Sequence, residues 1–209
     1  MFITFEGIDL SGKSTQIKLL EDYLKRKKKK VITVREPGGT MISEKIRDIL
    51  LDKKNLHMEN VTEFLLFSAS RYQLVNEIIL PRLKKNYYVL CDRYFDSSTA
   101  YQGFGGKVDL KNIYTINKIA SANLDPDLTF LINISEKEFL RRKKAIKKAE
   151  DRIEQKKLSY YKKVIKGYMT ISQNNKGRYV VIDGTKTVEE IHSVITDHIN
   201  KFNKKFKKK

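Results

Sequence analysis

The sequence predicts an α/β fold in which helices cover both faces of a five-stranded parallel sheet. Three observations predict it: strand and helix patterns alternate along the chain, Gly and Pro separate them, and a phosphate-loop pattern joins the first strand to the first helix. Such alternation is typical of parallel strands joined by right-handed crossovers. No linker, repeat or composition break divides the chain, so we expect a single domain over residues 1–209.

The elements follow one another in order. Short segments rich in apolar, β-branched or aromatic residues predict strands at 2–6, 31–35, 87–91, 128–134 and 178–182. The segments between them predict helices at 13–27, 41–51, 61–84, 110–122, 136–147, 151–173 and 188–202. Turn residues mark the joints at 37–39, 103, 105–106 and 125–126.

The composition limits the class of protein. Hydrophobic residues make up 40% and charged residues 33% of the chain, which argues against disorder throughout. No apolar run approaches the ~18 residues that a membrane-spanning helix needs, so we expect no membrane partner. A single cysteine, Cys91, cannot form an internal disulfide, and the first residues lack the features of a signal peptide. We therefore expect a cytoplasmic location.

The formal net charge of +18 has two interpretations. Much of the excess lies in the lysine-rich runs 25–30 and 204–209. These runs fit the C-terminal end of a helix and a chain end, where cations are well solvated. Adventitious RNA binding is the alternative, because clustered lysine neutralises phosphate. We expect no specific nucleic-acid partner.

The strongest motif is a phosphate-binding loop at residues 7–14. Its sequence, GIDLSGKS, matches G-x-x-x-x-G-K-[ST] directly after a strand and directly before a helix. Glycines let successive backbone N–H groups face a phosphate, and the following helix directs its positive end at the same anion. We expect Lys13 to bind the β- and γ-phosphates of ATP and Ser14 to hold Mg²⁺.

Other P-loop classes are disfavoured. No N-K-x-D guanine motif is present, since Asn117-Lys118 continues as Ile119-Ala120, and no D-x-x-G switch follows the third strand. A small-molecule kinase remains as the expected class.

A second anion site is predicted from the polar residues that follow other strands. Ligands of open α/β sheets bind beyond the carboxyl ends of the strands. There the chain places Arg35, then Arg47 in the next helix, and Asp92 followed by Arg93. Arginine suits a second phosphate, and Asp92 suits Mg²⁺, acting through water.

A base-binding surface is predicted on the long helix 61–84. Phe67 and Arg71 lie one turn apart on the same face and offer an aromatic ring and a donor. Each also has a purely structural interpretation: Phe67 as core, Arg71 as a solvated residue and Arg93 as an ion-pair partner. Cys91 is expected to be buried and without chemistry.

These motifs together resemble the thymidylate kinase family, of the bacterial type, along essentially the whole chain. The matching blocks are FEGID with SGKST, REPGGT, LLF with Ala69 and Arg71, DRY with Ser97, Ser98 and YQG, and DRIE at 151–154. The resemblance implies a P-loop nucleoside monophosphate kinase fold, usually a homodimer. It implies transfer of phosphate from Mg·ATP to dTMP, giving dTDP in a step of dTTP synthesis.

The resemblance also implies roles for individual residues. Arg47 and Arg93 would bind the thymidylate phosphate, Phe67 would stack on thymine, and Arg71 would reach a thymine carbonyl. Asp9 would contact the sugar 3′-hydroxyl, and Tyr101 would exclude a 2′-hydroxyl. The expected acceptor-binding set is Asp9, Arg47, Phe67, Arg71, Arg93, Ser97, Ser98, Tyr101 and Gln102. The expected ATP-binding set is Gly7, Ile8, Asp9, Leu10, Ser11, Gly12, Lys13, Ser14, Thr15, Arg141 and Arg142.

The family's lid falls at about 141–152, and here the sequence departs from the family pattern. The bacterial type carries arginine in the lid, yet the middle of this lid is lysine. Arg141, Arg142 and Arg152 remain as candidates to stabilise the transferring phosphoryl group, and a lysine is the alternative. We expect the catalytic set to be Lys13, Arg93, Arg152 and Asp9.

Two rival functions stay open at this point. A deoxynucleoside kinase would act on an uncharged acceptor, for which two arginines would have no use. A nucleotide- or RNA-binding protein without turnover is the rival outside the enzymes.

Overall fold

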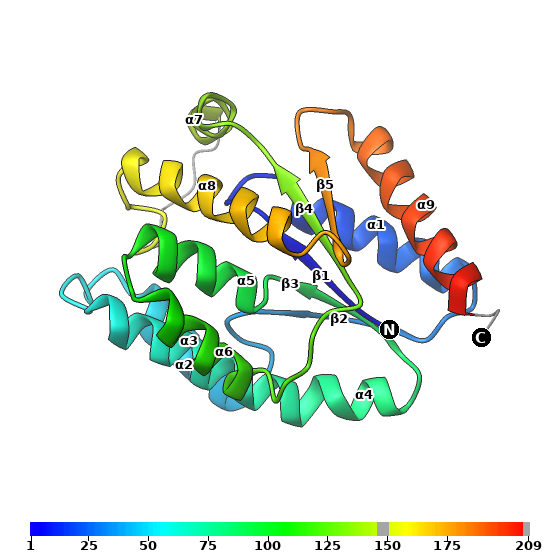
Figure 1. Ribbon diagram of the computed structural model, residues 1–209, viewed down its shortest axis with the longest axis horizontal. Coiled ribbons are helices and arrows are strands. Elements are labelled where there is room, and N and C mark those ends of the chain that lie inside the picture. The colour runs from blue at the N-terminus through cyan, green and yellow to red at the C-terminus, as the bar shows by residue number, and fades with distance from the viewer. Residues whose placement is uncertain (146–150, 207–209) are drawn as a thin grey trace.

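Five parallel strands form one sheet in the computed structural model, which describes residues 1–145 and 151–206 (Figure 1). The strand order is β2-β3-β1-β4-β5, and every pairing is parallel. The predicted fold class is confirmed, and the strand bounds agree with the prediction to within a residue or two at the ends. The strands are β1 Phe2–Glu6, β2 Val31–Arg35, β3 Tyr88–Asp92, β4 Leu128–Asn133 and β5 Tyr179–Asp183.

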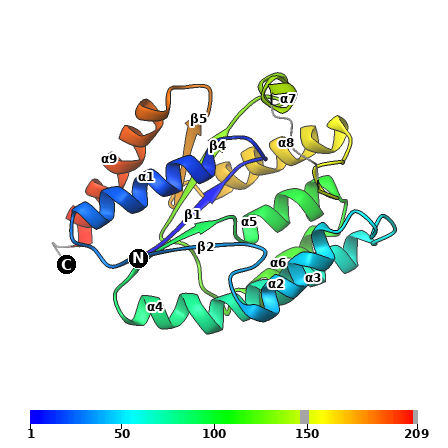
Figure 2. The same cartoon turned by 180° about the vertical axis from the view of Figure 1, so that it is seen from behind.

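Helices connect the strands and cover both faces of the sheet. In Figures 1 and 2, α1 and α9 lie side by side on one face, while α3, α5 and α8 lie on the other. The helical elements are α-helices, labelled α, and two π-helical segments, labelled η. They are α1 Lys13–Arg26, α2 Met41–Leu51, α3 Asn60–Leu74, η1 Val75–Ile79, α4 Leu80–Lys84, α5 Phe95–Ser98, η2 Thr99–Gly105, α6 Leu110–Ala120, α7 Glu136–Ala145, α8 Leu158–Asn174 and α9 Val188–Phe206.

Four clusters of buried apolar side chains form the core of the described residues, and the two with the most members lie on opposite faces of the sheet. β1 is buried along its whole length because it lies at the centre of the sheet. On the α1 and α9 face, Leu20 and Ile195 pack with Phe5 and Phe130. On the other face, Tyr161 and Tyr168 of α8 pack against residues around η2 and α7. These clusters fix the strand ends that carry the polar residues.

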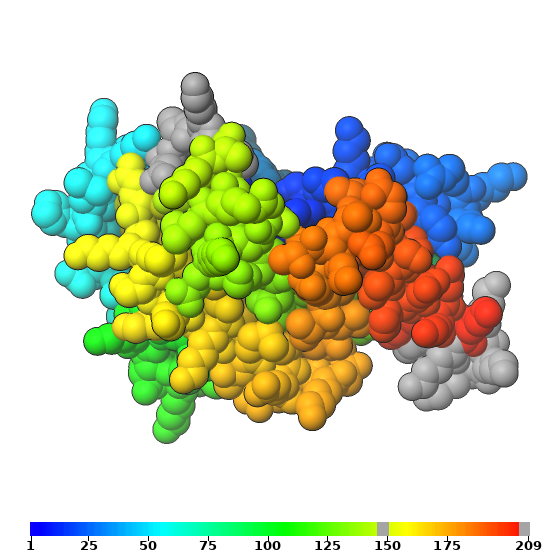
Figure 3. Space-filling model, turned by 90° about the horizontal axis from the view of Figure 1, so that it is seen from above, coloured from blue at the N-terminus to red at the C-terminus, as the bar shows by residue number. Residues whose placement is uncertain are grey.

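The candidate site lies at the carboxyl ends of β1 and β3. These strands are neighbours, but the chain leaves β1 toward β2 on one side and leaves β3 toward β4 on the other. These two connections run in opposite directions at the carboxyl edge of the sheet, the edge at which open α/β folds bind ligands. Figure 3 views the molecule from above Figure 1, and α7 (yellow-green) lies at its centre, between the segment before α8 (yellow) and the β5–α9 connection (orange).

The predicted helix 61–84 is interrupted in the structure. A π-helical segment, η1, separates α3 from α4, and the Leu80 N–H bonds to the Val75 carbonyl five residues earlier. Pro81 follows directly and has no N–H to donate. The change to the wider helix accommodates the proline without ending the helical path.

Two further segments differ from the prediction. The helical stretch formed by α5 and η2, residues 95–105, was not predicted, because its Gly-rich sequence resembles a loop. The helix predicted at 151–173 begins only at Leu158. Residues before it form turns, because the Asp151 carboxylate accepts hydrogen bonds from the Ile153 and Glu154 N–H groups. The middle of the predicted lid, 146–150, lies outside the described residues.

Candidate active site

The phosphate loop has the backbone geometry that its glycines predict. Gly7 has φ 134° and Gly12 has φ 102°, both in the left-handed region that disfavours other residues. An added Cβ on Gly7 would lie 2.4 Å from the Ile132 carbonyl oxygen on the neighbouring strand. Gly12 is the N-cap of α1 and makes no side-chain capping bond, so the first N–H groups of the helix are available to an anion.

Lys13 and Arg93 converge on one carbonyl oxygen. The Lys13 Nζ donates to Gly7 O at 3.1 Å and to Ile8 O at 2.9 Å. The Arg93 Nη1 donates to the same Gly7 O at 2.8 Å. Burial, with Arg93 nearby, lowers the pKa of Lys13 to about 8. The two cations therefore lie side by side at the base of the phosphate loop.

Asp9 holds the other side of the Arg93 guanidinium. Arg93 Nη2 bonds to Asp9 Oδ1 at 2.6 Å, and the Tyr101 hydroxyl donates to Asp9 Oδ2 at 3.3 Å. Burial opposes ionisation of Asp9, but the charges of Arg93 and Lys13 outweigh it and lower the pKa. Asp9 is therefore ionised and orients the arginine toward the cavity.

Ser14 and Asp92 form an oxygen pair that fits a magnesium ion. The Ser14 hydroxyl donates to Asp92 Oδ2 at 3.0 Å, and both residues line the pocket that contains Lys13. A hydroxyl and a carboxylate are ligands that Mg²⁺ prefers, with water completing its shell. No group of three or more His, Cys, Asp or Glu side chains with metal-binding geometry occurs among the described residues.

The pocket over the phosphate loop is here called the P-loop pocket. Of the predicted ATP-binding residues, it is lined by Asp9, Leu10, Gly12, Lys13, Ser14, Thr15, Arg141 and Arg142. The other three loop residues, Gly7, Ile8 and Ser11, do not line this pocket. The carbonyl oxygens of Gly7 and Ile8 accept from Lys13, and Ser11 is buried.

The two lid arginines of α7 are held differently. Arg142 Nη1 donates to Leu10 O at 3.0 Å and Nη2 donates to Gly184 O at 2.6 Å, so its guanidinium lies over the phosphate loop. Both arginines pair with Glu138, but the Arg141 side chain is 70% exposed and the Arg142 side chain 24%. Arg142 is therefore the better placed of the two to meet a phosphate.

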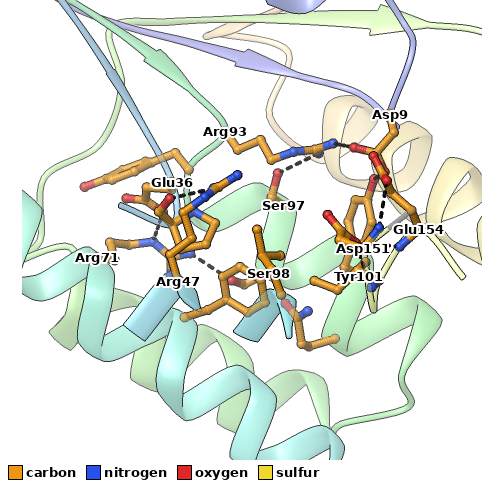
Figure 4. Close-up of a pocket in the computed structure, with 16 residues that line it drawn as sticks. Asp9, Glu36, Arg47, Arg71, Arg93, Ser97, Ser98, Tyr101, Asp151 and Glu154 are labelled. Carbon is orange, nitrogen blue, oxygen red and sulfur yellow. Dashed lines mark hydrogen bonds and ion pairs between the residues drawn. The ribbon is translucent and has the colours of Figure 1, made fainter. Parts of the chain in front are cut away.

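A second, more enclosed pocket adjoins the first and is here called the acceptor cavity (Figure 4). Every predicted acceptor-binding residue lines it: Asp9, Arg47, Phe67, Arg71, Arg93, Ser97, Ser98, Tyr101 and Gln102. The two pockets share Asp9, Glu36, Arg47, Arg93 and Glu154, so they meet at the carboxyl end of β3.

Arg71 is completely buried and fixed by three acceptors. Its Nε donates to Glu36 Oε2 at 2.7 Å, Nη1 to Asn117 Oδ1 at 2.9 Å and Nη2 to Ser98 Oγ at 2.8 Å. Burial raises the pKa of Glu36 to about 7 despite the opposing charge of Arg71. The structural interpretation of Arg71 as a solvated residue is therefore wrong.

A buried network beneath Arg93 was missed in the sequence. The Glu6 carboxylate, at the end of β1, accepts from Ser97 Oγ at 2.6 Å and from the Tyr168 hydroxyl at 2.9 Å. Burial, with Asp96 nearby, raises the pKa of Glu6 to about 7. Tyr168 comes from α8, and its contact with β1 is visible only in three dimensions, whereas a carboxylate in an otherwise apolar strand was a signal in the sequence for Glu6.

Arg152 does not lie at the phosphate loop in this structure. Its side chain is 4% exposed, Nη1 pairs with Glu63 at 2.7 Å, and Nε donates to Leu50 O at 2.8 Å. It is absent from the lining of both pockets. Its predicted contact with the transferring phosphoryl group stays a prediction, which this arrangement does not support.

Comparisons with known proteins identify the family of this chain. A family model described as thymidylate kinase matches residues 5–195. The chain belongs to the thymidylate kinase family. The thymidylate kinase of Sulfurihydrogenibium sp. (strain YO3AOP1) is 46% identical, with 95% of this chain and 96% of the relative aligned. That of Thermosipho africanus is 46% identical, over 95% of this chain and 99% of the relative.

A solved structure supports the same assignment. The crystal structure of thymidylate kinase from Ehrlichia chaffeensis matches with a TM-score of 0.78 and 32% identity, over 96% of this chain and 98% of that chain. The predicted family and the predicted class, a nucleoside monophosphate kinase, are confirmed. No helix of the described residues is long and apolar enough to cross a membrane.

Proposed function

We propose that this chain transfers the γ-phosphoryl group of ATP to dTMP, giving ADP and dTDP, with ATP in the P-loop pocket and dTMP in the acceptor cavity. The observation that carries the proposal is the convergence of Lys13 and Arg93 on the Gly7 carbonyl. Lys13 lines the P-loop pocket, and Arg93 lies where the two pockets meet; such a pair suits two phosphates that must meet in line.

The acceptor cavity supplies a group for each part of dTMP. Arg93 and Arg47 bind its phosphate, and Phe67 stacks on thymine while Arg71 and Gln102 read its polar edge. The Tyr101 ring, with its hydroxyl on Asp9, forms the wall beside the sugar. Asp9 then accepts from the 3′-hydroxyl, and the tyrosine leaves little space for a 2′-hydroxyl.

Catalysis in this arrangement requires no strong base, because the acceptor is already an anionic phosphate. The protein aligns the two phosphates and neutralises charge through Lys13, Arg93 and the α7 arginines. Ser14 and Asp92 would hold Mg²⁺, which neutralises oxygens of the ATP phosphates when bound. α7 over the phosphate loop limits access of water, against which ATP must be protected.

A panel of acceptors tests the proposal. Purified chain with Mg·ATP is offered dTMP, UMP or thymidine, and ADP formation is measured with a coupled assay. We expect turnover with dTMP, at least roughly tenfold less with UMP, which carries a 2′-hydroxyl and lacks the thymine methyl group, and none with thymidine because Arg93 and Arg47 require a phosphate. Equal turnover of thymidine would favour a deoxynucleoside kinase, and no ADP above a Lys13→Ala control would favour a binding protein.

The homodimer and the cytoplasmic location are further parts of the proposal. Ile49 of α2 and Leu65 and Tyr72 of α3 are 47%, 48% and 50% exposed, which supports a second copy packing on these helices. Sedimentation velocity tests the dimer, and a monomer at every concentration would refute it.

The single Cys91 is buried and unpaired, which suits a reducing compartment. Recovery in the membrane or secreted fraction of cells would refute that location.

A further inference from the structure

We propose that Glu63 is a positioning residue that fastens residues 151–156 to the acceptor cavity and links them to Gln102. The inference rests on the proposed function of that cavity. Glu63 lies on α3 one turn before Phe67 and two turns before Arg71, so the three share one face of the helix. It touches neither pocket directly and would act through its neighbours.

Both oxygens of the Glu63 carboxylate have partners from distant parts of the chain. Its Oε1 accepts from Gln102 Nε2 at 2.8 Å, and its Oε2 pairs with Arg152 Nη1 at 2.7 Å. Lys156 Nζ lies 4.0 Å from Oε2. The Glu63 side chain is 2% exposed, so water cannot replace these contacts. One carboxylate thus joins the base-reading residue of η2 to the segment that precedes α8.

The fastened segment forms part of both pockets. Asp151, Ile153 and Glu154 line the acceptor cavity, and Glu154 lines the P-loop pocket as well. Its backbone is attached at two further points: Arg152 N donates to Leu51 O at 3.3 Å, and Lys143 Nζ of α7 donates to Glu154 O at 3.0 Å. A displacement of residues 151–156 would therefore change the shape of the acceptor cavity and the support of α7.

The negative charge of Glu63 is what holds the buried Arg152 side chain, and with it residues 151–156, in place. Arg152 is nearly fully buried, and Glu63 is the one carboxylate paired with it among the described residues. An uncompensated buried guanidinium is strongly unfavourable, so removal of the Glu63 charge favours release of Arg152 to solvent. Arg152 Nη2 has no hydrogen-bond partner in the described part of the chain. Nε is held by Leu50 O, so the Glu63 carboxylate is the partner that neutralises the charge of this side chain among the described residues.

Hydrogen exchange of the ligand-free protein tests the anchor without any turnover. Glu63→Gln is compared with Glu59→Gln, the same change at an exposed position beside the same helix. We expect amide exchange of the 151–157 peptide to be at least about tenfold faster in Glu63→Gln than in wild type or Glu59→Gln, with the α1 peptides unchanged. Equal exchange in all three proteins would overturn the proposal.

Kinetics then tests the link to the acceptor. We expect Glu63→Gln to raise the KM for dTMP roughly tenfold while the KM for ATP and kcat change less than about threefold. Arg152→Met should give the same pattern, and the double variant should be no worse than either single variant, because both remove one interaction. A loss confined to kcat, or additive losses, would instead assign Arg152 to the transferring phosphoryl group.

One outcome separates this proposal from the proposed function. If wild type does not phosphorylate dTMP but Glu63→Gln still loosens residues 151–157, the anchor stands and the substrate assignment fails. If Glu63→Gln does not fold, Glu63→Asp keeps the charge on a shorter side chain that cannot reach both partners. Faster exchange at 151–157 in Glu63→Asp supports the anchor, and wild-type exchange overturns it.

Discussion

The two pockets differ in how their charged side chains are held. In the P-loop pocket, Lys13 and Arg142 donate mainly to backbone carbonyls, which a phosphate oxygen can replace. Around the acceptor cavity, Arg71 and Arg152 are buried in ion pairs with Glu36 and Glu63. Cations of the first kind are available to a moving, highly charged ligand. The buried, ion-paired arginines are fixed in position and define the shape of the acceptor cavity.

This difference fits the ligand proposed for each pocket. ATP carries several phosphate charges, so exchangeable donors around the phosphate loop can follow charge as it moves during transfer. Thymine is neutral, and a neutral base is recognised by fixed donors and acceptors in a pocket of defined shape. Substitutions at the P-loop pocket should therefore affect ATP and kcat, whereas substitutions around the acceptor cavity should affect dTMP selection and stability.

The largest effect is expected at Lys13. Because this residue lines the P-loop pocket, its substitution should lower the rate of phosphoryl transfer and leave the fold intact. Lys13→Ala should lower kcat by at least about 10²-fold, the effect of removing one preorganised charge in a phosphoryl-transfer site. Because burial lowers the pKa of Lys13 to about 8, the charged form is lost as pH rises through that value. In wild type we therefore expect ATP affinity, measured by titration calorimetry, to fall above pH 8.

The matched control for this prediction is Lys18→Ala, an exposed position on the same helix. It should leave kcat and ATP affinity unchanged. Full ATP affinity in Lys13→Ala, or a flat pH dependence in wild type, would contradict the account of the P-loop pocket.

An intermediate effect is expected within α7, where two neighbouring arginines differ in their contacts with the P-loop pocket. Arg142 lies over the phosphate loop through Leu10 O and Gly184 O, while Arg141 is largely exposed. Arg142→Ala should raise the KM for ATP roughly tenfold, as expected for a charge-assisted contact to phosphate. Arg141→Ala, its matched control, should change it less than about twofold. Steady-state kinetics with ATP varied decides between them, and equal effects would show that the lid does not distinguish the two arginines.

The same contrast explains what the sequence could and could not predict. The phosphate loop is a local motif, so its role follows from residues adjacent in the chain, and Arg93 follows a strand end. Phe67 and Arg71 were found from their helical spacing. Glu63 lies on the same face one turn earlier, and a charged residue on that face of the helix is the signal in the sequence that points to it.

Other parts of the site depend on contacts that no local pattern contains. Asn117 of α6 and Tyr168 of α8 reach the site only because the helices pack on one face of the sheet. η2 was missed because π-helical turns in a Gly-rich segment depend on their packing against α8. Arg152 was assigned by its place in the predicted lid, but a buried partner on α3 outweighs that local expectation.

A further effect, on stability and not on turnover, is expected in the pH dependence of unfolding, which follows from the buried carboxylates around the acceptor cavity. Burial raises the pKa of Glu36 to about 7, above the ordinary glutamate value of 4.5. The folded state therefore binds this proton more tightly than the unfolded state does. Its contribution to stability is fully present below pH 4.5 and is lost as the pH rises through 7.

Urea unfolding at pH 5 and pH 8 tests this sign. Between these values wild type should lose on the order of 2 kcal/mol of unfolding free energy through Glu36, with Glu6 adding a loss in the same direction. Glu36→Gln should lose less over the same interval, because an amide does not titrate, while Glu77→Gln at an exposed position should behave like wild type. If Glu36→Gln and wild type lost the same free energy, Glu36 would be ionised throughout, and its pairing with Arg71 would outweigh the cost of burial.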